Sequence, residues 1–196
     1  MRFLLVLIGF ASVSAMTVSS ARDRGEMNSA FESQVASAEY NRLSERLSRL
    51  AKKGHWGGAD RIYRDLRALD SALSYRDLFI GAQVERRRGN VQASYECLRD
   101  AAKIEGTREV IDWLVALEEQ YGPVSLTLER QADSRLVPEG PMFLPEHQKA
   151  VDYAQSLLLA NRAFEGLLPV GGYTVGGQRI QVRANEVQQV QIPKSP

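Results

Sequence analysis

The sequence has few of the side chains that build metal sites and disulfides. Its 196 residues include one cysteine, Cys97, and two histidines, His55 and His147. A single cysteine cannot form an internal disulfide or a thiolate-rich metal site. A zinc site would need further His or Cys ligands, and the adjacent Glu146 and His147 would diverge on a helix. We therefore expect no bound metal ion.

An excess of one charge and long apolar runs are also missing. The chain has 25 Lys and Arg against 24 Asp and Glu, so its net charge is close to zero. This balance argues against a nucleic-acid partner, because such proteins carry a basic surface. The most apolar stretch, Phe3–Phe10, is well short of the ~20 residues that a membrane-spanning helix needs. We therefore do not expect an integral membrane protein.

The chain lacks common catalytic and nucleotide-binding motifs. It has no G-x-S-x-G, no P-loop and no G-x-G-x-x-G after a predicted strand. Cys97 is interpreted as a small buried hydrophobe rather than a reactive thiol. His55 is interpreted as a solvated turn residue rather than an acid or base. The sequence thus predicts a non-enzymatic protein with no catalytic residues and no cofactor.

Residues 1–21 have the pattern of a secretory signal peptide. Arg2 is followed by the apolar run and then by small residues, which is the order of an export signal. Cleavage is expected after Ala15 or Ala21, and the alternative is an uncleaved membrane anchor. A lipoprotein signal is excluded because the only cysteine is Cys97. The short signal and the absence of disulfides predict a periplasmic or secreted bacterial protein.

Residues 22–121 form the predicted helical domain. Apolar residues recur at helical spacing in five segments, which are expected at about 29–53, 58–70, 74–88, 91–104 and 107–121. Ser29 and Glu32 have the spacing of a capping box at the first helix. Gly54 follows two lysines and is expected to end that helix. Ser74 is expected to begin the third.

The helical segments repeat with a period of 35 residues. Gly54 matches Gly89, and the same spacing relates Trp56, Ala59, Tyr63 and Leu66 to Val91, Ser94, Leu98 and Ala101. These residues resemble the tetratricopeptide family, in which a small residue lies where two helices touch and a large one fills the next layer. The resemblance implies an array of stacked helical hairpins. Leu47 and Glu85 depart from the family pattern, and the alternative is a generic helical bundle.

Residues 122–196 are predicted to be a small antiparallel β-domain with an inserted helix. Periodicity changes to two after Gly122-Pro123. Residues 131–145 contain three prolines and are expected to be a loop, and residues 146–161 a helix. Gly176-Gly177 lies between two β-type runs, which is a strong hairpin signal. The fold class is therefore α+β, with helical hairpins first and the β-domain second.

The stretch from Leu168 to Ile192 resembles the end of a PEGA-type domain. The likeness lies in Leu168-Pro169, Gly172, Tyr173-Thr174-Val175, the Gly-Gly turn, Ile180 and Val182. Domains of this family are extracytoplasmic and usually non-catalytic, and they accompany other domains. The resemblance implies a β-sandwich accessory module.

A partner-binding face is predicted on the third helix. Arg76, Phe79, Gln83 and Arg86 have spacings of three, four and three, so they share one helix face. Stacked hairpins commonly bind extended peptides on their concave side. We therefore expect these residues to bind acidic side chains or a free carboxylate of a protein partner. The alternative is a solvated face whose arginine stems cover the layer below.

Two binding functions follow from these patterns. The first is an exported scaffold or adaptor that mediates protein–protein interaction in the bacterial cell envelope. The alternative is an accessory module that binds cell-envelope glycan, for which Trp56, Trp113 and Tyr121 are candidate platforms, although their repeat positions favour core packing. An enzyme is the third hypothesis.

Overall fold

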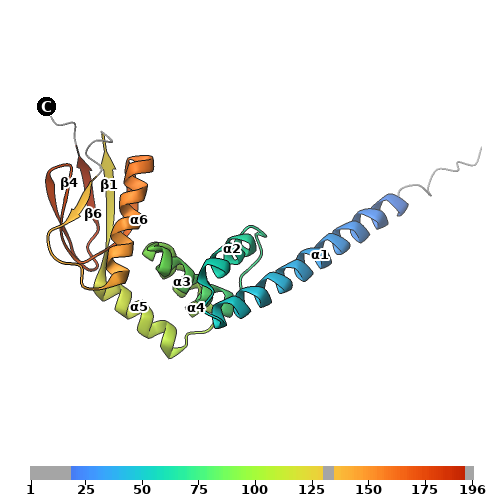
Figure 1. Ribbon diagram of the computed structural model, residues 1–196. Helices are drawn as coiled ribbons and strands as arrows, with labels where there is room; N and C mark the ends of the chain where they lie inside the picture. The colour runs from blue at the N-terminus through green and yellow to red at the C-terminus, as the bar shows by residue number, and fades with distance from the viewer. Residues whose placement is uncertain (1–18, 130–134, 193–196) are drawn as a thin grey trace, which may run out of the picture. The chain divides into compact units, whose positions relative to one another are not determined.

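The computed structural model describes residues 19–129 and 135–192, with side chains from Gln34 onward. The described chain is α+β, which confirms the predicted fold class (Figure 1). Its contacts divide it into two units, Met1–Asn41 and Arg42–Pro196. In the first unit the described residues, 19–41, are helical. The expected signal segment, residues 1–21, lies outside the described residues apart from its last three.

The first five helices follow the predicted order. They are α1 (Ser19–Lys52), α2 (Trp56–Arg67), α3 (Tyr75–Arg88), α4 (Val91–Ile104) and α5 (Arg108–Gln120). One start was wrong, because Ser29 lies inside α1 and does not cap it. Five of residues 19–28 are good helix formers (Ala, Arg, Glu or Met), and the helix extends through this segment.

The ends of these helices are fixed by the residues that the sequence indicated. Gly54 and Gly89 have φ of +71° and +86°, the left-handed conformation that ends a helix. The Ser74 side chain accepts a hydrogen bond from the Asp77 N–H at the start of α3. Thr107 caps α5 in the same way.

Small residues bring neighbouring helices close together. The Ser94 hydroxyl of α4 is fully buried and donates to the Ala82 carbonyl of α3 at 2.8 Å. Tyr63 of α2 is fully buried against α3, where a Cβ on Gly81 would stand 2.3 Å from the Tyr63 Cζ. Only glycine therefore fits at position 81. The resemblance to tetratricopeptide repeats stays a prediction.

The strands form two three-stranded sheets. They are β1 (Tyr121–Leu128), β2 (Leu136–Pro138), β3 (Ala163–Pro169), β4 (Gly171–Val175), β5 (Gln178–Val182) and β6 (Gln188–Ile192), in the orders β3-β1-β6 and β2-β4-β5. The Gly176-Gly177 hairpin between β4 and β5 is confirmed, with φ of +57° and +76°. The other strand pairs are antiparallel, as expected of the β-domain, and β6 adds one parallel pair with β1.

Two strands lie where the sequence gave no expectation of one. Residues 131–145 were expected to be a loop, but β2 lies within them and pairs with β4. β3 pairs antiparallel with β1 over its whole length. Pro123 lies inside β1, which is tolerated because pairing with β6 begins only at Val124. The helical half therefore runs from α5 directly into β1, and the domain boundary at 121–122 stays a prediction.

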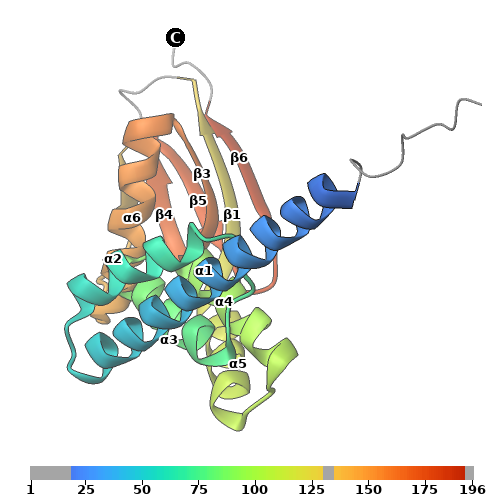
Figure 2. The same cartoon turned by 90° about the vertical axis from the view of Figure 1, so that its right-hand side faces the viewer.

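Helix α6 (Pro145–Asn161) closes one side of the two sheets, as both views show (Figure 2). Val151, Ala154 and Leu158 of α6 are buried in the same core as Leu126 of β1 and Val175 of β4. The other side of α6 contacts α3, and β3 contacts α4. The inserted helix and β3 therefore both join the β-strands to the helical array.

Candidate functional site

The four residues predicted to share a binding face have three different environments. Gln83 and Arg86 line a cleft between α3 and α6. Phe79 packs beside that cleft, with ring centroids 5.5 Å from Trp113 and 6.1 Å from Tyr75. Arg76 does not line the cleft, because its guanidinium donates to the Ser44 hydroxyl on α1 at 3.0 Å. Arg76 thus does not join Arg86 in the cleft, and partner binding by the four residues stays a prediction.

Arg76 belongs instead to a polar cluster between α1 and α3. The Ser44 hydroxyl donates to both Asp77 carboxylate oxygens at 2.8 and 2.9 Å. The Ser74 hydroxyl donates to Asp77 Oδ2 at 2.6 Å. Asp77 is fully buried, so these bonds compensate for its loss of water. Periodicity placed Arg76 on the right face of the helix but did not reveal that α1 occupies its part of that face.

The cleft measures about 280 Å³ and is lined by residues of three helices. They are Gln83, Arg86 and Arg87 of α3, Trp113 of α5, and Glu146 and Lys149 of α6. The basic run Arg86–Arg88 was a visible signal for part of this lining. Nothing in the sequence indicated that Glu146 and Lys149 would join it, because they lie sixty residues further along the chain.

The three consecutive arginines have different partners. The Arg86 guanidinium lies 5.5 Å from the centre of the Trp113 ring, and that of Arg87 lies 4.1 Å from the Trp56 ring. Arg88 points away and pairs with Asp60 and Glu85 at 3.4 and 3.7 Å. Cation–π contacts of this kind hold a guanidinium in place without neutralising its charge. Arg86 and Arg87 therefore remain positively charged groups with restricted positions.

The electrostatics of the cleft favour an anion. Among the described residues, Arg86, Arg87 and Lys149 form no ion pair. Glu146 is the one carboxylate of the lining, so the cleft has three positive groups and one negative group. Helix α6 also begins here, and its N-terminal end carries a partial positive charge. The arrangement suits binding of a carboxylate.

The buried Tyr121 and the half-buried His147 form an aromatic pair near this cleft. Their rings meet edge to face with centroids 5.3 Å apart. The Tyr121 hydroxyl and His147 Nε2 are both buried without a hydrogen-bond partner among the described residues. Burial raises the pKa of Tyr121 and lowers the pKa of His147, and the charges of Arg86 and Glu146 act on both. These two groups are therefore held neutral at pH 7.

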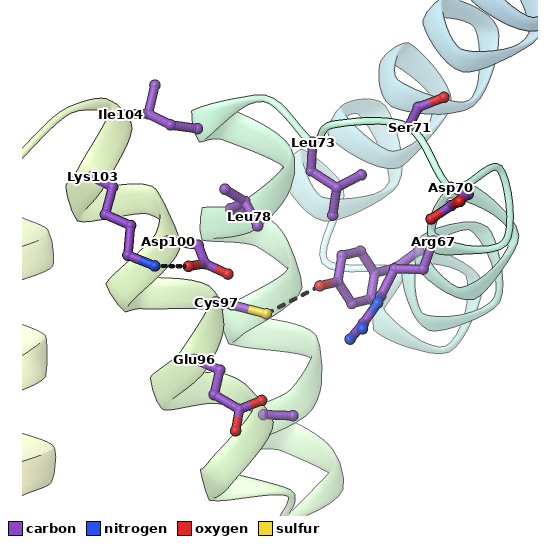
Figure 3. Close-up of a pocket in the computed structure, with 12 residues that line it drawn as sticks. Arg67, Asp70, Ser71, Leu73, Leu78, Glu96, Cys97, Asp100, Lys103 and Ile104 are labelled. Carbon is purple, nitrogen blue, oxygen red and sulfur yellow. Dashed lines mark hydrogen bonds and ion pairs between the residues drawn. The ribbon is translucent and has the colours of Figure 1, made fainter.

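Cys97 lies in the wall of a second cavity, between α2 and α4 (Figure 3). Its side chain is 5% exposed, which confirms the expected burial. Its Sγ lies 3.1 Å from the Tyr63 hydroxyl, and the two share a hydrogen bond. Burial raises the pKa of the Cys97 thiol, so little thiolate forms at neutral pH.

The other histidine and the three aromatic candidates differ in exposure. His55 is exposed in the turn before α2. Trp56 and Trp113 are half-buried, whereas Tyr121 is 1% exposed.

Within residues 19–129 and 135–192, no three His, Cys, Asp or Glu side chains are placed to hold a metal ion. In the same part of the chain no helix has the length and apolar character to cross a membrane.

Comparison of the chain with protein-family models, with curated proteins and with solved structures found no match.

Proposed function

We propose that the mature chain is a non-enzymatic exported adaptor of the bacterial cell envelope, and that its cleft binds an acidic segment of a protein partner. The observation that carries the proposal is the pair of arginines, Arg86 and Arg87, each held over a tryptophan and neither neutralised by a described carboxylate. Two cations with restricted positions lose little conformational entropy when they bind a carboxylate. Export is proposed from the pattern of residues 1–21.

The neighbouring arginine supplies a matched control for this proposal. Replacing Arg86 and Arg87 by Gln removes two charges from the cleft, whereas Arg88→Gln removes one charge that is already paired with Asp60 and Glu85. A charge-assisted hydrogen bond contributes ~1.5–3 kcal/mol when well formed. Because ~1.4 kcal/mol corresponds to a tenfold change, the double variant should lose at least about tenfold in affinity for the partner.

The experiment is affinity capture from the envelope fraction of the source cells with the wild type and both variants. The adaptor proposal expects a polypeptide that is retained by the wild type and by Arg88→Gln but not by the double variant. Equal retention by all three proteins would contradict a role for the cleft. Retention on purified cell wall without other proteins would instead favour glycan binding.

Export is tested separately by the intact mass of the native protein. A mass that starts after Ala15 or Ala21 supports the proposed location. A mass that retains residues 1–15, with recovery only in detergent, would show a membrane anchor.

A further inference from the structure

A second cavity has no role in the proposed adaptor function. It measures about 460 Å³, and none of its lining residues lines the cleft between α3 and α6, called here the basic cleft. Arg67, Asp70 and Leu73 lie on one wall, and Glu96, Asp100 and Lys103 lie on the facing helix α4 (Figure 3). Its volume is in the lower half of the ~300–1,000 Å³ range of small-ligand sites. A ligand of one or two residues would fill it, and a long chain would not.

The uncharged part of the lining is largely apolar. It includes Leu73, Leu78, Ala93 and Ile104 together with the hydrogen-bonded Tyr63 and Cys97. The Ile104 side chain is 58% exposed, although it is one of the larger apolar side chains of α4. An apolar group that entered the cavity would cover this surface and would gain from its removal from water.

The lining carries five charged side chains, and two of opposite sign, Arg67 and Asp70, lie three residues apart. Among the described residues, neither Arg67 nor Asp70 forms an ion pair, whereas Lys103 is paired with Asp100 at 2.6 Å and Glu96 accepts a hydrogen bond from Gln92 at 2.8 Å. Arg67 is the last residue of α2, and the Asp70 N–H donates to its carbonyl at 3.4 Å. Asp70 has a φ of +50°, which is uncommon for a residue other than glycine. Backbone conformations of this kind are concentrated at binding sites.

We propose that this cavity binds an α-amino acid zwitterion with an apolar side chain. Arg67 would hold the carboxylate, and Asp70 would accept hydrogen bonds from the ammonium group. The ligand's side chain would lie against the apolar lining beside Tyr63 and Cys97. The two ligand charges are attached to one carbon atom, which matches an unpaired cation and an unpaired anion at one end of α2.

The test uses L-leucine and three analogues that each lack one feature, measured by titration calorimetry with the full mature chain. L-leucine amide lacks the carboxylate, N-acetyl-L-leucine lacks the ammonium group, and glycine lacks the side chain. Loss of a charge-assisted hydrogen bond is expected to weaken binding at least about tenfold relative to L-leucine. Equal affinity for leucine and any one analogue, or no binding of leucine at millimolar concentration, would overturn the proposal.

Two variants test which residue binds the carboxylate and which binds the ammonium group. Arg67→Gln should abolish the preference for leucine over leucine amide, and Asp70→Asn should abolish the preference over N-acetyl-leucine. Asn tolerates positive φ, so the second variant keeps the backbone conformation. Arg64→Gln is the control, because Arg64 pairs with Asp60 and does not line the cavity. The proposal fails if Arg64→Gln has the same effect as Arg67→Gln.

Cys97 gives a second readout that does not depend on heats of binding. Because its thiol lies in the cavity wall, bound leucine should slow its alkylation by iodoacetamide, whereas glycine should not. An unchanged alkylation rate at saturating leucine would place the ligand elsewhere and overturn the assignment. Neither result bears on the adaptor proposal, whose test uses the other site.

Discussion

The backbone of Gly89 lies directly against the Lys149 carbonyl, so that a Cβ on Gly89 would stand 2.1 Å from that oxygen. Gly89 ends α3 with a φ of +86°, and Lys149 lies in the second turn of α6. One glycine therefore both ends a helix of the array and lets α6 pack against it. The same contact helps to place Lys149 in the basic cleft.

Gly89→Ala should therefore destabilise the chain more than Gly54→Ala. Both glycines have positive φ, which costs a residue with a Cβ ~1–2 kcal/mol. A Cβ on Gly54 would meet nothing within 4 Å, so strain is its only cost. At Gly89 the clash should add a further ~1–3 kcal/mol. Urea unfolding of both variants measures the difference, and equal losses would show that the contact with α6 is unimportant for stability.

Tyr121→Phe should leave stability unchanged or raise it by about 1 kcal/mol. The Tyr121 hydroxyl is buried without a partner among the described residues, and such a group costs ~1–3 kcal/mol. Tyr173→Phe is the control, because the buried Tyr173 hydroxyl donates to the Pro169 carbonyl at 2.7 Å. That variant should lose ~0.5–1.5 kcal/mol. Thermal and urea unfolding distinguish the two, and a large loss in Tyr121→Phe would reveal an unrecognised partner of the hydroxyl.

His147 should make stability fall as the pH falls below about 6.5. Burial lowers the pKa of His147 in the folded chain from its ordinary value of 6.5. Between the two values the unfolded chain binds a proton that the folded chain does not, so the unfolding free energy decreases as the pH falls. His147→Phe, which keeps a ring against Tyr121, should lose this component.

The control for this pH dependence is His55→Asn, because His55 is exposed in a turn. Its unfolding free energy should follow the same pH profile as that of the wild type. The measurement is urea unfolding from pH 8 to pH 5. Parallel profiles for wild type and His147→Phe would show that His147 does not cause the loss of stability at low pH.

Without added ligand, Cys97 should react slowly with thiol reagents in the native chain. Its thiol is buried and bonded to Tyr63, and burial raises its pKa. A raised pKa leaves less of the reactive thiolate, and burial keeps the reagent away from the sulfur. Labelling at pH 8 should therefore be several-fold slower or more than in urea-unfolded protein, by ~1 kcal/mol or more of protection against opening. Equal rates in the two states would mean that the thiol is accessible and ionised.

Much of the fold was visible in the sequence because it depends on local chemistry. Gly54, Gly89 and the Gly176-Gly177 pair end elements through their own φ angles, and Ser74 caps α3 through its own hydroxyl. These features involve residues close together in the chain. They were therefore predicted correctly without knowledge of any tertiary contact.

Errors arose where a distant partner decided the outcome. β2 is three residues long and includes Pro138, so it lacks a strand pattern and exists because β4 pairs with it. β3 does alternate, with Phe164 and Leu168 buried, and its pairing partner β1 lies about forty residues earlier in the chain. β6 follows β5 in the chain, yet it joins the other sheet and runs parallel to β1.

In the candidate site, too, local features were predictable from the sequence and features set by distant partners were not. The sequence by itself determined the α+β class, the order of the helices and the basic run Arg86–Arg88, because periodicity and turn chemistry act within a few residues. Only the tertiary structure separated the three arginines, placed Arg76 beside Ser44 and brought Lys149 to Arg86. These outcomes depend on which helix packs against each side of α3. That choice follows from burial of the whole core, and no local pattern encodes it.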